Sequence, residues 1–225
     1  MFHRLIPSFA WKLIIPLLII RALPSLKNYE FSPQKFRDAA SKGASASGNG
    51  VDIFVSELRK TYSKSIPRNL YWTSFSAGGL NLRAQIIYPG MMEYVAVLGA
   101  PTRTSGRSGF HWSNSSCTVL SGEVSRYADH VPSFAKESFK TGGNFRHGEF
   151  ESYIYEFGPE TFVACYGRGV IPVSALWPTT GALSGGDIVA PLRMGFVYAE
   201  SYYYWIGEYV SNLWGQATKK IKSEL

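Results

Sequence analysis

The stretch that most constrains the fold of this 225-residue chain is FVACYGRGVIP, residues 162–172. Its first five residues alternate aromatic, branched and small apolar side chains, which indicates a buried β-strand. Gly167-Arg168-Gly169 then interrupts the pattern, because glycine permits a sharp turn of the backbone. Apolar sequence of helical character follows Pro172. A strand that carries Cys165 therefore leads directly into the C-terminal part of the chain.

The central part of the chain reads as a series of short strands separated by Gly, Pro, Ser and Asn. These segments are residues 71–75, 84–88, 94–98, 117–120, 152–157 and 162–166. Short strands at regular spacing predict a barrel or a sandwich. Before them, residues 52–62 carry apolar side chains on one helical stripe, whereas the Gly/Ser/Ala-rich residues 41–51 predict a flexible loop. Residues 173–183 and 189–214 predict two apolar helices.

The N-terminal residues 5–23 form a hydrophobic segment of nearly the ~20 residues that cross a bilayer. A cleaved signal peptide is the alternative, but no clean small-x-small cleavage site follows, and we expect an uncleaved anchor. The chain ends in Lys-Ser-Glu-Leu, one residue away from a KDEL-type retrieval signal of the endoplasmic reticulum (ER) lumen. The aromatic cluster at residues 202–205 suits the headgroup level of a membrane or a helix packed on the barrel.

Composition narrows the class of partner. The chain is 45% hydrophobic and 15% aromatic, which favours an aromatic-lined cavity, a membrane interface, or both. Its net charge of +7 is spread along the sequence, and no nucleic-acid-binding motif accompanies it. We therefore expect a lipophilic small-molecule partner and no nucleic acid.

The sequence around residues 162–172 resembles the sterol C8-isomerase/sigma-1 receptor family. YGRGVIP, with Gly158-Pro159 before it, is similar to the C-terminal signature of that family. WTSFSAGG at residues 72–79 is similar to the family's Trp-to-Asn-Ala-Gly-Gly segment, with Ser76 at the asparagine position. Glu93-Tyr94-Val95 matches a strand that contributes a pocket tyrosine, whereas Arg107 stands where the family carries a histidine.

The resemblance implies an α+β fold in three parts. Residues 1–28 would be an N-terminal membrane helix, residues 29–172 a cupin-like β-barrel that holds the ligand, and residues 173–225 two helices that cover the barrel mouth and touch the membrane. It also implies an ER membrane location with a lumenal domain and a homo-oligomer, a trimer. The four histidines show no metal-ligand spacing, so we expect neither a metal nor another cofactor.

This chain departs from the family at the two positions that matter most for its chemistry. Family members carry two pocket carboxylates, and the matching positions here are Cys117 and Cys165, the only cysteines of the chain. Sterol double-bond migration needs an acid that protonates an alkene. A thiol, with a pKa near ~8.5 rather than ~4, is on the order of 6 kcal/mol poorer as a proton donor. We therefore expect the family's sterol reaction to be lost in its usual form.

Three interpretations stay open at this point. First, Cys117 and Cys165 could form a disulfide. Second, they could serve a changed isomerisation, cyclisation or pericyclic reaction on a terpenoid, sterol-like or polyketide-like substrate. Third, the chain could bind hydrophobic ligands without catalysis. A genuine C8 sterol isomerase is a further alternative to the changed reaction. As catalytic candidates we take Cys117, Cys165 and Tyr94. As ligand-binding candidates we take Trp72, Phe75, Ile86, Leu98, Trp112, Asn114, Phe157, Tyr166, Ile171, Ala175 and Tyr198.

Overall fold

The computed structural model describes residues 29–46, 48–129 and 135–223, with backbone only for most of the last 20 of these. The chain divides into two compact units, Met1–Glu30 and Phe31–Leu225, and the second contains the fold described below. The predicted membrane anchor and the terminal retrieval signal fall wholly or partly outside the described residues. Within those residues, no helix has the length and hydropathy needed to cross a bilayer.

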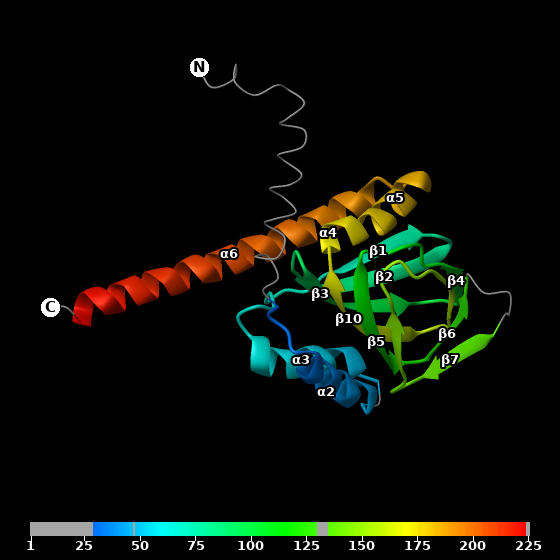
Figure 1. The fold of residues 1–225 in the computed structure, drawn as a ribbon, viewed down its shortest axis with the longest axis horizontal. Helices are drawn as coiled ribbons and strands as arrows, with labels where there is room; N and C mark the ends of the chain where they lie inside the picture. Colours follow the sequence, from blue (N-terminus) through cyan, green and yellow to red (C-terminus); the bar gives the residue numbers. More distant parts are fainter. Residues whose placement is uncertain (1–28, 47, 130–134, 224–225) are drawn as a thin grey trace, which may run out of the picture. The chain divides into compact units, whose positions relative to one another are not determined.

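In the described part of the chain, ten strands form two antiparallel sheets, and helices lie on either side of them (Figure 1). The six-stranded sheet has the order β1-β2-β3-β10-β5-β8, and the four-stranded sheet has the order β4-β9-β6-β7. The expected α+β class is confirmed. The strands are β1 Trp72–Ala77, β2 Leu80–Pro89, β3 Glu93–Ala100, β4 Thr104–Arg107, β5 Ser113–Ser121, β6 Glu123–Ala128, β7 Lys136–Lys140, β8 Asn144–His147, β9 Tyr153–Phe157 and β10 Thr161–Gly169.

The signature strand β10 lies at the centre of the large sheet, between β3 and β5. Its pairing places Cys165 opposite Ala96 of β3 and opposite Cys117 of β5. Because side chains alternate between the two faces of a strand, Cys165 and Tyr166 point to opposite sides of the sheet. Two separate hydrophobic clusters follow from this alternation, one on each face.

Helices α2 (Pro33–Ala44) and α3 (Gly50–Tyr62) cover the outer face of the six-stranded sheet. The flexible loop predicted at residues 41–51 is therefore too long, since α2 continues to Ala44 and α3 starts at Gly50. Small residues serve close packing here. A Cβ added to Gly43 would lie 2.7 Å from the Gly50 carbonyl oxygen and 3.0 Å from the Phe54 Cβ. The small residues in this segment therefore allow α2 and α3 to pack closely, and they do not mark a flexible loop.

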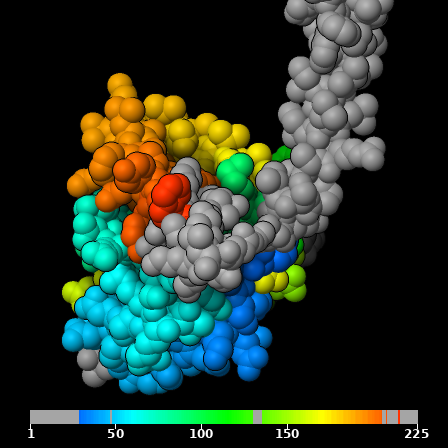
Figure 2. All heavy atoms as spheres, turned by 90° about the vertical axis from the view of Figure 1, so that its left-hand side faces the viewer, coloured from blue at the N-terminus to red at the C-terminus, as the bar shows by residue number. Residues whose placement is uncertain are grey.

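The C-terminal helices α4 (Ile171–Ser174), α5 (Leu176–Ser184) and α6 (Val189–Ser223) follow β10 directly. Figures 1 and 2 show the first half of α6 and α5 at the opposite end of the fold from α2 and α3. Helix α5 approaches β1 closely, because a Cβ on Gly181 would lie 2.4 Å from the Ala77 Cβ. The C-terminal helices thus close one end of the space between the sheets, as expected for this part of the chain.

Candidate functional site

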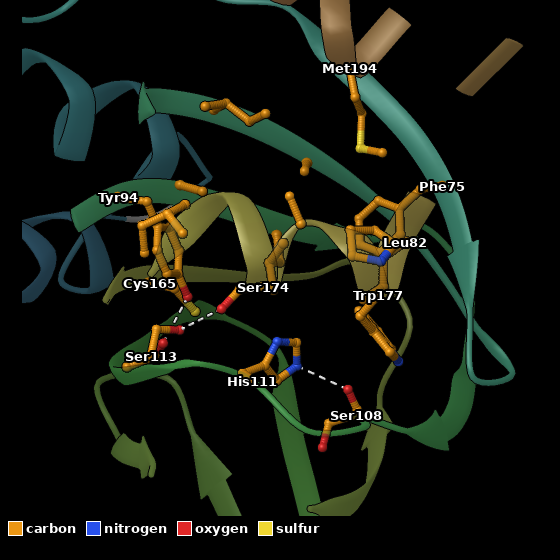
Figure 3. Close-up of a pocket in the computed structure, with 18 of the residues that line it drawn as sticks. Phe75, Leu82, Tyr94, Ser108, His111, Ser113, Cys165, Ser174, Trp177 and Met194 are labelled. Atoms are coloured by element: carbon orange, nitrogen blue, oxygen red, sulfur yellow. Dashed lines mark hydrogen bonds between the residues drawn. The ribbon is translucent and has the colours of Figure 1, made fainter. Parts of the chain in front are cut away.

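A cavity of about 520 Å³ lies between the inner faces of the two sheets and beneath α4, α5 and α6. Its volume falls within the ~300–1,000 Å³ typical of small-molecule sites. Most of its wall is apolar, and aromatic rings stand at several points of it. Phe75 of β1 and Trp177 of α5, for example, meet edge to face with their ring centroids 6.2 Å apart. Figure 3 shows these two rings on one side of the cavity and Tyr94 with Cys165 on the other.

The alternation of each strand determines which residues reach the cavity. On β5, Ser113, Ser115 and Cys117 line it; β2, β3, β8, β9 and β10 contribute every second residue in the same way. Ten of the residues expected in the site lie in this wall. They are Phe75, Ile86, Tyr94, Leu98, Cys117, Phe157, Cys165, Ile171, Ala175 and Tyr198.

Tyr166 and Trp72 lie on the outer face of the sheet and do not line the cavity. Tyr166 follows the inward Cys165, and its hydroxyl donates to Glu93 Oε2 at 2.8 Å in the cluster beneath α2. Trp72 lies three residues before the inward Phe75, so it faces the other way. Its ring packs on Phe162, with the centroids 5.7 Å apart. Assigning both residues to the pocket ignored the alternation of the strand.

Trp112 and Asn114 also lie outside the cavity, on either side of the inward Ser113. Trp112 is 46% exposed just before β5 begins, and its ring contacts Phe150 at a centroid distance of 5.0 Å. Asn114 is exposed, and its Oδ1 accepts a hydrogen bond from the backbone N–H of Glu149 at 3.2 Å. It holds the loop after β8 instead of lining the cavity.

Cys117 and Cys165 form a disulfide in the cavity wall. They are direct partners in the register of β5 and β10, and both are buried. A disulfide carries no thiol proton and no charge. The catalytic role that we considered for the two thiols is therefore unavailable while this bond is intact.

Tyr94 keeps its place in the wall through a close fit with two neighbours. Its hydroxyl lies 2.9 Å from Ser115 Oγ, and a Cβ added to Gly167 would lie 2.2 Å from its ring. Gly167 of the signature thus makes room for this ring. Burial raises the pKa of Tyr94, only partly opposed by the bond to Ser115, so the phenol stays protonated at neutral pH.

Two histidines that the sequence analysis set aside lie together in the wall. The rings of His111 and His147 meet edge to face at a centroid distance of 5.1 Å. His111 Nε2 lies 2.9 Å from the backbone oxygen of Ser108 (Figure 3), and His147 Nδ1 lies 3.1 Å from the Tyr155 hydroxyl. The inward position of His147 was available from the sequence only through the strand β8, which carries too few apolar residues to be predicted.

Burial keeps both imidazoles neutral. It lowers the pKa of His111, although the Ser108 carbonyl opposes this. It lowers the pKa of His147 to about 4, with further lowering from His111 and partial opposition from the backbone carbonyl of Glu151. The cavity therefore presents neutral hydrogen-bonding groups at pH 7.

None of the described residues that line the cavity is Asp or Glu. The described part of the chain also contains no group of three or more His, Cys, Asp and Glu side chains placed to hold a metal. What the wall offers is apolar surface, a disulfide, the weakly acidic hydroxyl groups of Ser, Thr and Tyr side chains, and two neutral imidazoles. Such a wall suits a neutral lipophilic molecule better than a cation.

Comparisons with known proteins identify relatives of this chain. Sigma non-opioid intracellular receptor 1 of Xenopus tropicalis is 28% identical over 166 residues, which span 71% of this chain and 73% of that protein. C-8 sterol isomerase erg2 of Aspergillus fumigatus is 30% identical over 152 residues, which span 64% of this chain and 62% of that protein.

Among solved structures, a predicted oxalate decarboxylase of Thermotoga maritima aligns over 46% of this chain at 12% identity, with a TM-score of 0.37. A putative ethanolamine utilization protein of Salmonella typhimurium aligns over the same share with a TM-score of 0.35. The model of the family described as ERG2 and Sigma1 receptor like protein matches residues 9–203. The chain belongs to this family.

Proposed function

We propose that this chain binds a neutral, lipophilic molecule of terpenoid or sterol type in the cavity and is not a C8 sterol isomerase. The observation that carries the proposal is the disulfide between Cys117 and Cys165, which stands where the family resemblance places two carboxylates. The apolar wall would gain free energy from covering the ligand's hydrocarbon surface, at roughly 25 cal/mol per Å².

The missing carboxylates argue against a charged amine as the ligand. A cation in an apolar cavity costs free energy unless an anion or several oriented dipoles compensate it. The nearest buried carboxylate on the same sheet, Glu93, belongs to the outer face, where it accepts hydrogen bonds from Tyr166 and from the backbone N–H of Phe31. It is not available to a ligand inside.

The weak acidity of the side chains that line the cavity argues against sterol double-bond migration. Protonating an alkene needs an acid, and the described wall offers only neutral imidazoles and phenols. Burial raises the pKa of Tyr94, and it raises the pKa of Tyr198 to about 12, with small additions from Tyr202 and Tyr94. These groups are weaker proton donors than any carboxylic acid.

A second candidate function is a rearrangement directed mainly by the shape of the cavity. Tyr94, Ser115 and the two histidines bring several neutral donors and acceptors to one wall, which simple storage of a hydrocarbon would not require. An isomerase or cyclase could use such groups to orient a terpenoid, sterol-like or polyketide-like substrate and to stabilise developing charge.

The exposed surface of the C-terminal helices supports a membrane-bound location, and we propose the ER membrane. Apolar side chains on α5 and α6 that are more than half exposed include Leu183, Leu192 and Phe196. A bilayer interface would cover such a surface. The lumenal orientation and the homotrimer rest on the resemblance and the KSEL terminus, and protease protection in microsomes and chemical crosslinking would test them.

The proposal can be tested with two ligands that share one skeleton, farnesol and N,N-dimethylfarnesylamine. The full chain in detergent should bind the alcohol at least about tenfold more tightly than the amine, and it should leave a Δ8-sterol unchanged. The Cys117→Asp, Cys165→Glu double variant should reverse the preference. Tighter amine binding by the natural chain, or its conversion of the Δ8-sterol, would overturn the proposal. A rearranged product recovered from bound farnesol would favour the second candidate.

A further inference from the structure

The polar groups of the cavity wall have a donor and acceptor pattern that selects a class of ligand. His111 and His147 are the two residues in question, and their rings lie 5.1 Å apart. Each ring uses one nitrogen within the protein, at Ser108 and Tyr155 respectively. The second nitrogen of each ring decides what the wall can bind.

The tautomer of His111 follows from its partner. The Ser108 backbone oxygen can only accept a hydrogen bond, so His111 Nε2 carries the proton and donates it. Because burial keeps this ring neutral, Nδ1 is then a bare acceptor. Figure 3 shows this second nitrogen pointing into the cavity and away from Ser108.

The tautomer of His147 follows from the bonds around Tyr155. The Arg126 guanidinium lies close enough to the Tyr155 side chain to oppose the rise of its pKa. A phenol beside a cation that can only donate directs its own proton away from it, so the Tyr155 hydroxyl donates to His147 Nδ1. His147 Nε2 is then the protonated nitrogen. It is buried in the wall and has no hydrogen-bond partner among the described residues.

A buried N–H without a partner costs about 1–3 kcal/mol, and native proteins contain few of them. We propose that His111 and His147 together bind one hydroxyl group of a neutral lipophilic alcohol. His111 Nδ1 accepts the hydroxyl proton, and His147 Nε2–H donates to the hydroxyl oxygen. This inference rests on the proposed function, since it assigns the polar end of the same ligand.

Among hydroxyl, carbonyl, ether and ammonium groups, only a hydroxyl satisfies both nitrogens with one atom. A carbonyl or ether oxygen accepts from His147 but gives His111 no proton, and an ammonium group donates to His111 but cannot accept from His147. The proposal requires one hydroxyl oxygen at hydrogen-bond distance, roughly 2.7–3.0 Å, from both His111 Nδ1 and His147 Nε2. The hydrocarbon part of the alcohol then extends toward Phe75 and Trp177 across the apolar wall.

The test compares three probes that differ only at this oxygen: farnesol, farnesyl methyl ether and the hydrocarbon farnesene. The full chain in detergent should bind the ether about fivefold more tightly than the hydrocarbon, and the alcohol about fivefold more tightly again, one factor for each hydrogen bond. Equal affinity of the three probes would overturn the assignment of the histidines and leave the binding of neutral lipids intact. Failure of all three to bind would overturn the proposed function as well.

Isosteric variants then assign each bond to one histidine. Gln replaces Nε2 of histidine with an amide, and Asn replaces Nδ1 in the same way. His111→Gln keeps the bond to Ser108 and removes the acceptor, so it should weaken farnesol about fivefold and leave the methyl ether unchanged. His147→Asn keeps the bond to Tyr155 and removes the donor, so it should weaken both probes.

The opposite amides serve as matched controls, because His111→Asn and His147→Gln keep the nitrogen that faces the ligand. Both should retain most of the farnesol affinity. Equal weakening of alcohol and ether by His111→Gln would overturn the assigned acceptor, and no effect of His147→Asn on either would overturn the assigned donor. Near-ultraviolet circular dichroism of each variant establishes that its fold is retained.

Discussion

The two faces of the six-stranded sheet handle buried polar groups in opposite ways. The outer face buries a carboxylate, Glu93, which is 1% exposed and accepts hydrogen bonds from Tyr166 and from the Phe31 backbone. Arg168 completes this group by donating to Tyr166 and to the Phe31 oxygen. The inner face carries a disulfide and neutral imidazoles, and no Asp or Glu among the described lining residues.

This difference separates stability from recognition within one strand. On the outer face, Glu93, Tyr166 and Arg168 bond to one another or to the Phe31 backbone, so this group holds the sheet to the segment before α2. The inner face leaves His147 Nε2 without such a partner, so its polar residues remain available to a ligand. Cys165 and Tyr166 are adjacent in sequence and serve these two different purposes.

The largest effect should come from removing the buried carboxylate of the outer face. Glu93→Leu removes the acceptor of the Phe31 N–H and one of the two acceptors of the Tyr166 hydroxyl, and it removes the buried negative charge near Arg168. It should lower the free energy of unfolding by about 3–5 kcal/mol. Urea denaturation measures the change. The exposed Glu149→Leu should alter stability by less than about 0.5 kcal/mol. A similar loss in both variants would show that the two sites are equivalent.

Breaking the disulfide should destabilise the inner face somewhat less. Cys117 and Cys165 are 48 residues apart, and opening a loop of that size should lower the free energy of unfolding by about 2–4 kcal/mol. Denaturation with and without a phosphine reductant measures this, and the chain has no other cysteine to react. The Cys117→Ala, Cys165→Ala variant is the control, since the reductant should not change its stability. An unchanged natural chain would contradict the prediction.

Acidic pH should lower the free energy of unfolding through the protonation of His147 on the inner face. The pKa of His147 is about 4 in the folded chain, below its usual value, so the unfolded state binds more protons between these two values. The contribution of neutral His147 to the free energy of unfolding is therefore complete above pH ~6.5. It is lost as the pH falls toward 4, by about 2 kcal/mol between pH 7 and pH 5. Denaturation as a function of pH measures it. In His147→Asn this part of the slope should disappear, and an unchanged slope would contradict the assigned neutral state.

The smallest effects should come from a matched pair of tyrosines, one on each face. Tyr166→Phe removes the donor to Glu93 and should lower the free energy of unfolding by about 1–2 kcal/mol, with farnesol affinity unchanged. Tyr94→Phe removes only the bond to Ser115 and should cost less than about 1 kcal/mol. Equal losses of stability, or loss of farnesol binding only in the Tyr166 variant, would contradict the division between the faces.

Prediction from the sequence succeeded where a single strand or helix carries its own pattern. The apolar runs near residues 94–98 and 162–166 lie within β3 and β10, and residues 52–62 lie within α3. The strands β4, β6, β7 and β8 were not predicted, because they are short and mix charged, polar and apolar residues, and so carry too little pattern. The helix α2 was not predicted, and its last turn was assigned to a flexible loop because Gly43, which permits close helix packing, reads as flexibility in the composition.

The candidate site was predicted only in part, because resemblance identifies positions without orientation. Ten expected residues line the cavity, whereas Trp72, Tyr166, Trp112 and Asn114 face elsewhere. The alternation of β5 and β10 could have corrected two of these. Once Cys117 and Cys165 face inward, Asn114 and Tyr166 must face outward.

The sequence by itself determined the family, the central strand that carries Cys165, and the replacement of two acids by the only two cysteines. These properties depend on residue identity and local spacing. Only the tertiary structure decided that the cysteines are bonded partners and that His111 and His147 lie together in the cavity wall. Strand register and burial set these contacts, and both arise from pairing between segments that lie far apart in the chain.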